Sequence, residues 1–105
     1  MGPTDRQQLG KDAINEALEL FHRRWMLRVI WEMREGAWTF RALQSRCGDI
    51  SPTVLNQRLG ELRDAGLVEN DEGGYRLTAM GHDMMEAFAP LSKWALRWWK
   101  TRLSS

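Results

Sequence analysis

The chain has 105 residues, of which 43% are hydrophobic and 28% charged, and its net charge is +1. This length and composition predict one globular domain, and the near-neutral charge neither favours nor excludes a nucleic-acid partner. The single cysteine, Cys47, excludes an intrachain disulfide, no apolar run is long enough to cross a bilayer, and no signal peptide precedes the fold, so we expect a cytoplasmic protein.

The N-terminal third predicts two helices. Residues 1–11 are polar and glycine-containing, so we expect a disordered or frayed arm before a single domain over residues 12–103. After the arm, apolar residues recur at helical spacing: Ala13, Ile14, Ala17, Leu18 and Phe21. The sequence HRRW (residues 22–25) should break or bend this helix. A second apolar series follows it and stops before Gly36: Trp25, Met26, Val29, Ile30 and Met33.

The middle of the chain predicts two short helices joined by a tight connection. Thr39 is suited to cap a helix over residues 40–47, and residues 48–51 make the connection. Ser51 then caps a helix with Pro52 at its first position, where the missing N–H costs nothing. The buried stripe of this helix is Leu55, Leu59 and Leu62. Gly66 should end it in a left-handed conformation.

The C-terminal third predicts a β-hairpin and a long helix. In the hairpin, Gly73 and Gly74 should supply positive φ at the turn. Thr78 caps the last helix, which Pro90 should kink or split. Two helices joined by a short turn and followed by a two-stranded ribbon predict a mainly α fold with a small β-hairpin, the winged helix-turn-helix.

Several blocks of the sequence resemble the HxlR-type family of bacterial winged helix-turn-helix regulators, relatives of the MarR type. The matching blocks run from about Ala13 to Trp99: ALEL, the tryptophan at position 25, VIWEM, TFRAL, ISPTVLNQRLGEL, AGLVE and YRLTAMGHDM. The resemblance implies a transcriptional regulator whose terminal helices form a homodimer interface. Two features depart from the family: no cysteine precedes the first helix, and the wing tip is the acidic DEGG (residues 71–74) where the family usually has a longer, basic wing.

One face of the helix 52–65 is rich in small and amide side chains and poor in charge. These residues are spaced at i, i+3, i+4 and i+7, and we interpret them as the face that reads DNA bases: Thr53, Asn56, Gln57 and Gly60. Asn and Gln can bond bidentately to adenine, and a threonine methyl can contact a thymine methyl. Alternatively, such a face is simply solvated. The candidates for DNA-backbone contact are Thr39, Arg41, Ser51, Arg58, Arg63 and Arg76.

Six tryptophans are unusual for a chain of this size. The apolar stripe on the last helix is too broad for one small domain to cover, and a large exposed apolar patch usually marks an interface. Together with the family resemblance it predicts a homodimer interface: Ala17, Phe21, Phe88, Leu91, Trp94, Ala95, Trp98 and Trp99. A tryptophan-walled hollow between subunits is also a candidate site for a planar aromatic effector.

No catalytic arrangement, metal set or cofactor motif is recognisable, since His22, His82 and Cys47 are isolated in the sequence. The predicted function is a dimeric, sequence-specific DNA-binding transcriptional regulator, acting as a repressor on double-stranded DNA and not as an enzyme. Whether the wing touches the DNA backbone is left open by its acidic tip. Two alternatives also stay open: a winged-helix protein-interaction module, and a regulator that responds to an aromatic ligand.

Overall fold

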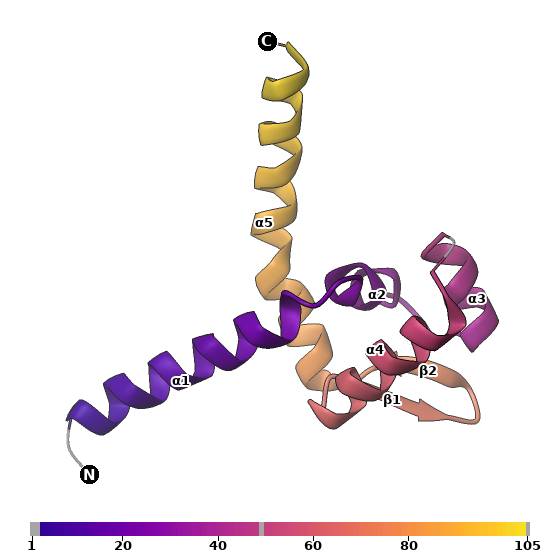
Figure 1. The fold of residues 1–105 in the computed structure, drawn as a ribbon, viewed down its shortest axis with the longest axis horizontal. Coiled ribbons are helices and arrows are strands. Elements are labelled where there is room, and N and C mark those ends of the chain that lie inside the picture. Colours follow the sequence, from indigo (N-terminus) through magenta and orange to yellow (C-terminus); the bar gives the residue numbers. More distant parts are fainter. Residues whose placement is uncertain (1–2, 49, 105) are drawn as a thin grey trace.

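The computed structural model describes residues 3–48 and 50–104 and consists of helices with one hairpin (Figure 1). The elements are α1 (Pro3–Phe21), α2 (Met26–Glu32), α3 (Phe40–Arg46), α4 (Pro52–Asp64), β1 (Val68–Asp71), β2 (Gly74–Leu77) and α5 (Ala79–Ser104). Their order confirms the predicted winged helix-turn-helix, with α3 and α4 as the helix pair and the hairpin as the wing. None of the helices in the described ranges is both long and apolar enough to span a membrane.

The first helix begins earlier than the sequence indicated. We expected a frayed arm over residues 1–11, but α1 already starts at Pro3; residues 1 and 2 of that arm lie outside the described residues. Three features favour the longer helix. Pro3 fits a first helical turn, Asp5 is attracted by the positive N-terminal end of the helix dipole, and Gln8 donates to Asp12 at i,i+4 over 2.9 Å.

The predicted helix boundaries in the middle of the chain are confirmed. Trp25 adopts a left-handed conformation (φ 74°) and separates α1 from α2. The hydroxyls of Thr39 and Ser51 each accept a hydrogen bond, from the N–H groups of Ala42 and Val54, both at 3.1 Å. Gly66 has φ 77° just after α4, as expected for a helix C-terminus. Asp49, in the predicted tight connection, lies outside the described residues.

The wing is an antiparallel pair whose register places Val68 opposite Leu77 and Glu69 opposite Arg76. Of the two turn glycines only Gly74 has positive φ (109°), so the prediction for Gly73 is wrong. The N–H of Gly73 is instead held at 2.8 Å by the Asp71 carboxylate, which closes the turn locally. Gly74 is required for a second reason, because a Cβ there would lie 2.6 Å from the carbonyl oxygen of Trp38.

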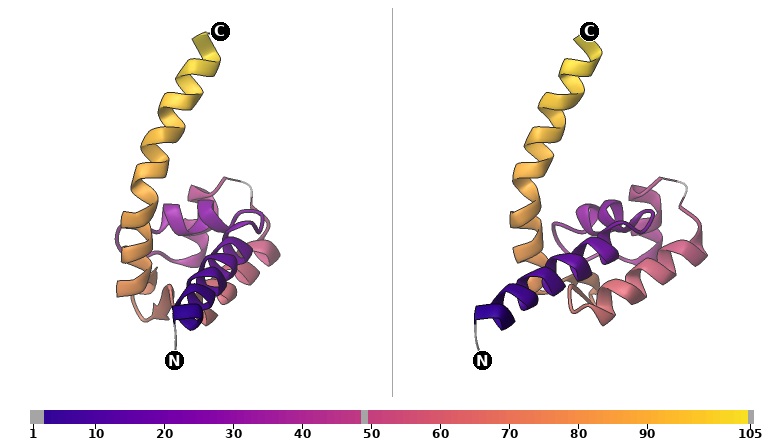
Figure 2. Two further views of the ribbon diagram at one scale, coloured as in Figure 1. Left: turned by 90° about the vertical axis from the view of Figure 1, so that its left-hand side faces the viewer. Right: turned by 60° about the vertical axis from the view of Figure 1, so that its left-hand side comes forward.

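One apolar core joins the helix pair to α2 and the wing. Its buried side chains come from α2, α3, α4, the two strands and the segments between these elements, and Gly81 of α5 is buried where it packs on the hairpin. The core residues are Met26, Val29, Ile30, Met33, Leu43, Cys47, Ile50, Leu55, Leu59, Leu62, Leu67, Val68 and Leu77. Helices α1 and α5 extend away from this core in different directions (Figures 1 and 2).

Helix α5 runs without interruption through Pro90, so the predicted split is wrong (Figure 2). Proline removes the hydrogen bond that its N–H would donate to the carbonyl of residue 86. Pro90 and Glu86 are both exposed, and water can therefore satisfy the carbonyl that the proline leaves unbonded. The helix can carry the proline because the affected turn faces solvent.

Candidate nucleic-acid interface

Helix α4 divides into a buried apolar face and an exposed uncharged face. Leu55, Leu59 and Leu62 are at most 1% exposed and anchor the helix in the core. Residues on the opposite side stay outside the fold: Thr53, Asn56 and Gln57 are all exposed. Within the described residues, their side chains are covered neither by α5 nor by the wing.

Gly60 extends this face by one further turn. It is partly buried, yet a Cβ built at this position meets no heavy atom within 4 Å. The space beside the Gly60 backbone is therefore open, which would allow another molecule to approach α4 closely. The uncharged face thus consists of Thr53, Asn56, Gln57 and Gly60, and we call it the α4 face.

The connection between α3 and α4 fixes the angle at which α4 is presented. The side-chain amide of Gln44 in α3 donates to the carbonyl of Ile50 over 3.2 Å. Cys47 and Ile50, at the two ends of the connection, are each only 2% exposed. The α4 face is consequently held by packed side chains at its beginning as well as along its length.

A network of charged side chains braces the flank of α4 against the turn between α1 and α2. Arg58 donates to the carbonyl of Arg24 at 2.8 Å and to the Glu61 carboxylate at 2.6 Å. The other oxygen of Glu61 accepts from Arg23 at 2.5 Å. The Arg58 side chain is only 17% exposed, so the guanidinium predicted to contact phosphate is committed within the protein. The i,i+3 spacing of Arg58 and Glu61 could have revealed part of this network, whereas its link to Arg23 and Arg24 has no sequence signal.

The wing arginine is also committed. Arg76 donates from Nε to Glu69 at 2.9 Å and from its second guanidinium nitrogen to Asp71. The hydrogen bond from Glu69, followed by the nearby charge of Asp71, raises the pKa of Arg76 further above its usual value. The hairpin register places Glu69 directly opposite Arg76, so the predicted contact of Arg76 with DNA phosphate competes with this cross-strand pair.

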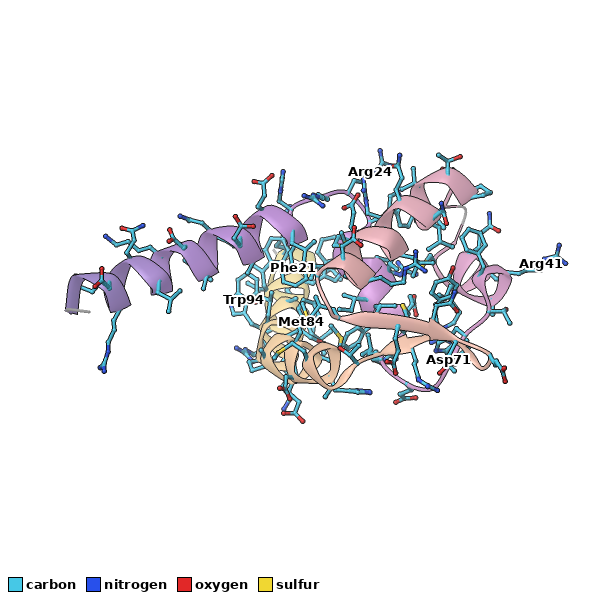
Figure 3. The ribbon with its side chains drawn as sticks, turned by 90° about the horizontal axis from the view of Figure 1, so that it is seen from below. Phe21, Arg24, Arg41, Asp71, Met84 and Trp94 are labelled. Atoms are coloured by element: carbon cyan, nitrogen blue, oxygen red, sulfur yellow. The ribbon has the colours of Figure 1, made fainter. Side chains whose placement is uncertain are left out.

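The other residues expected at the DNA backbone lie around the edges of the α4 face. Thr39 and Ser51 are exposed and serve as the caps of α3 and α4. Arg63 is exposed near the end of α4. Arg41 projects from α3 into solvent (Figure 3). It lines a polar hollow of about 260 Å³ with Gln44, Ser45 and Gly48.

The residues predicted for the dimer interface fall into two groups. Phe21 and Phe88 are partly buried against their own domain, and the Phe88 ring lies 5.6 Å from that of Trp31 in α2. Further along α5 the side chains are open to solvent: Leu91, Trp94, Trp98 and Trp99 are 46–52% exposed. The rings of Trp94 and Trp98 are stacked, with 5.6 Å between their centroids and an angle of 9° between their planes. Ala17 and Ala95, on α1 and α5, are partly buried.

A pocket of about 530 Å³ lies where α1 approaches the start of α5, close to Phe21 and Met84 (Figure 3). Its lining is apolar with acidic side chains among it, and contains none of the tryptophans: Glu16, Ala17, Glu19, Leu20, Phe21, Arg23, Ala65, Leu67, Met80, Asp83 and Met84. A tryptophan-walled hollow between two subunits is a different site, and it stays a prediction.

The one cysteine is packed in the core. Cys47 is 2% exposed, and burial, with a smaller effect from Glu32, raises the pKa of its thiol. A thiol in this setting is protonated and shielded, unlike the exposed thiolate that reactive cysteines need. Among residues 3–48 and 50–104, no cluster of three or more His, Cys, Asp or Glu side chains could hold a metal ion.

Comparison with known proteins identifies the family of this chain. The HxlR-like helix-turn-helix family matches residues 20–102, from the end of α1 almost to the end of α5. The chain belongs to the HxlR-like helix-turn-helix family. The resemblance inferred from the sequence blocks is thereby confirmed, and this HxlR-like protein is a helix-turn-helix transcriptional regulator and not an enzyme.

Relatives of this HxlR-like protein agree with that assignment. It is 27% identical to the uncharacterized HTH-type transcriptional regulator YvaP of Bacillus subtilis, over 79% of the chain and 83% of YvaP. It is 32% identical to the uncharacterized HTH-type transcriptional regulator Rv3095 of Mycobacterium tuberculosis, over 79% of the chain but only 56% of the longer relative.

Solved structures show the same fold. The quinone-bound YodB of B. subtilis superposes with a TM-score of 0.77 at 27% identity, covering 82% of this chain and 98% of YodB. A possible HxlR family transcriptional factor from Thermoplasma volcanium superposes with a TM-score of 0.71 at 27% identity, covering 79% of this chain and 81% of the other.

Proposed function

We propose that this HxlR-like protein is a dimeric, sequence-specific repressor that inserts α4 into the DNA major groove and blocks promoter access in the cytoplasm. The observation that carries the proposal is the exposed α4 face, which presents two side-chain amides and a threonine on a helix locked into the core. Asn and Gln can bond bidentately to adenine, and a surface serving only solubility would favour charged side chains.

The backbone contacts would surround this face. The capped N-termini of α3 and α4, beside Thr39 and Ser51, present N–H groups suited to phosphate oxygens. Arg41 and Arg63 are the arginines best placed to add charge, since both are exposed and no ion pair to either is found within the described residues. Arg58 braces α4 and supports the contact only indirectly.

The exposed rings on α5 support the homodimer. Three tryptophans and Leu91 on α5 are each close to half exposed, and they form a surface that an isolated protein would leave in water. Pairing of two copies through Ala17, Phe21, Phe88 and Ala95 and the exposed rings would bury it. A two-fold axis would then match an inverted-repeat operator with half-sites about one helical turn apart.

A ligand-responsive form of this regulator is a second candidate. Its support is the tryptophan-rich surface together with the structural likeness to YodB, which was solved with a quinone bound. The ligand would be a planar aromatic compound held between the subunits and would release DNA. Titration of the purified protein with a panel of such compounds, followed by tryptophan fluorescence, tests this: absence of quenching or shift across the panel would remove the candidate.

Affinity for random duplex DNA, measured against salt concentration, separates the repressor from a protein-interaction module. Each phosphate neutralised contributes about −0.9 to the slope of log affinity against log salt, so a regulator should show a steep negative slope. The matched control is a variant carrying both Asn56→Ala and Gln57→Ala. It should keep the affinity and salt slope of the wild type on random duplex DNA, and lose only the preference for an operator duplex. A flat salt response, or no binding at low salt, would favour the interaction module.

A further inference from the structure

The wing carries an excess of acidic side chains, and two of them bind its one arginine. The hairpin carries three acidic side chains, Glu69, Asp71 and Glu72, and one basic side chain, Arg76. The wing therefore has an excess of two negative charges. All four side chains are exposed, while Val68 and Leu77 of the same strands point into the core. Asp71 lies at the free end of the hairpin (Figure 3).

Two carboxylates hold the Arg76 guanidinium from different sides. Glu69 is directly opposite in the strand register and accepts from Nε, and Asp71 accepts from a terminal nitrogen. Asp71 is itself fixed by the turn, since its other carboxylate oxygen accepts from the N–H of Gly73 at 2.8 Å. The arginine is therefore oriented along the wing with its charge compensated, and a phosphate would either use its remaining N–H donors beside two carboxylates or displace those carboxylates.

Displacing them has two costs at a DNA surface. The existing ion pairs must be broken, and the freed carboxylates would then lie close to phosphates, within the screening length of about 10 Å at 0.1 M salt. Each exposed pair has only a modest strength, and the repulsion between the freed carboxylates and the phosphates adds to the cost of breaking it. The balance favours an arginine that stays on the wing while α4 enters the groove.

We propose that Glu69 and Asp71 withhold Arg76 from DNA, so that the wing limits the affinity of this regulator instead of contributing to it. The inference rests on the proposed DNA-binding function and assigns the wing carboxylates a specific role in it. Such a wing reduces the sequence-independent attraction to phosphate and leaves base readout unchanged. A larger share of the binding free energy then comes from the α4 face.

The test compares wing variants in equilibrium binding to an operator-containing duplex across a salt series. Glu69→Gln combined with Asp71→Asn should raise affinity by about threefold or more at low salt and steepen the salt slope by about 0.9 per protomer, the contribution of one additional phosphate contact. Asparagine at 71 keeps the oxygen that accepts from Gly73, so the turn is preserved. Arg76→Gln alone should lower affinity only through the repulsion of the two carboxylates it leaves unpaired, and it should not reduce the steepness of the salt slope, because no phosphate contact is lost.

Two controls separate release of Arg76 from a simple change in charge. Glu72→Gln removes a wing carboxylate for which no arginine partner is found in the described residues, and should give a smaller gain without the added slope. The triple variant Glu69→Gln, Asp71→Asn, Arg76→Gln should lose most of the gain, because the contact requires the arginine. A salt slope that becomes shallower by about 0.9 per protomer in Arg76→Gln alone, or an equal gain in the double and triple variants, would overturn the proposal.

The proposed DNA-binding function and the proposed role of the wing can be refuted by different results. Wild-type protein that shows no salt-dependent affinity for duplex DNA would remove the proposed function and this inference together. Wild-type protein that binds, and loses operator preference on Asn56→Ala with Gln57→Ala, while every wing variant behaves as wild type, would retain the function and refute only the role of the wing.

Discussion

Replacing Gly60 by alanine should stabilise the fold and weaken DNA binding at the same time. A Cβ at Gly60 meets no heavy atom within 4 Å, so the methyl group fits the free protein without displacing a neighbour. Alanine in a helix interior is favoured over glycine by about 0.8–1.0 kcal/mol. For a domain of this size, such a gain corresponds to a rise in melting temperature of about 4–8 °C.

The same methyl group would project from the α4 face toward the DNA. An extra methyl in a closely packed contact costs about 1–3 kcal/mol, which corresponds to roughly 5- to 150-fold in affinity. The two measurements are thermal unfolding of the free protein and equilibrium binding to the operator duplex. Because stability and affinity should move in opposite directions, weakened binding cannot be attributed to damage to the fold.

Gly10→Ala is the matched control. Gly10 is also inside a helix, is exposed, and has no heavy atom within 4 Å of a built Cβ, but it lies on α1 away from the α4 face. This variant should gain a similar stability and bind DNA as the wild type does. If Gly60→Ala bound the operator as tightly as Gly10→Ala, the reasoning that places this edge of α4 in the groove would be refuted.

Three further predictions follow from the same structure. Asn56→Ala and Gln57→Ala should each keep the fold and cost about 1–3 kcal/mol of base discrimination; competition against operators with single base-pair changes measures this, and unchanged preference in both would refute the readout face. Trp98→Ala should weaken the dimer, seen in sedimentation velocity as a fall in mass on dilution at concentrations where the wild type stays paired; equal masses would argue against this interface. Burial raises the pKa of the Cys47 thiol above its ordinary 9.0, so the stability linked to its protonation is intact below that value and is lost as the pH rises through the folded-state value. Urea unfolding of wild type and Cys47→Ala across alkaline pH should show the wild type losing more stability, and parallel curves would contradict the linkage.

Local chemistry made most of the fold predictable. The caps at Thr39 and Ser51, the proline after Ser51 and the glycine at position 66 fix helix ends through hydrogen bonds and dihedral angles that depend on a few adjacent residues. The leucine stripe of α4 then follows from helical periodicity alone. For the same reason the exposure of Asn56 and Gln57 could be inferred before any coordinates were considered.

The errors occurred where distant or competing interactions decide the outcome. The start of α1 at Pro3 reflects a first turn that suits proline, the position of Asp5 and the Gln8–Asp12 hydrogen bond, which together outweigh the glycine content of the segment. The continuity of α5 through Pro90 depends on that turn being exposed to water, which periodicity does not report. Gly73 is not among the positive-φ glycines, and its N–H is held by the Asp71 side chain within the turn.

Among the candidate site residues, arginines were the least predictable. Three-dimensional proximity decides whether a guanidinium binds phosphate or a protein group. Arg58 binds Glu61, three residues away, and the Arg24 carbonyl, 34 residues away in the chain. Arg76 binds Glu69 and Asp71 within the wing. The exposure of side chains that point away from the core, such as Asn56, was predictable because the core defines that direction.

Selection of bound sequences from a random duplex pool tests the central claim most directly, namely that the α4 face reads base edges. We expect wild-type protein to enrich an inverted repeat with half-sites about one helical turn apart, and the variant with Asn56→Ala and Gln57→Ala to lose that enrichment while still retaining duplex. Recovery of no preferred sequence by the wild type, or of the same sequence by both proteins, would contradict the account.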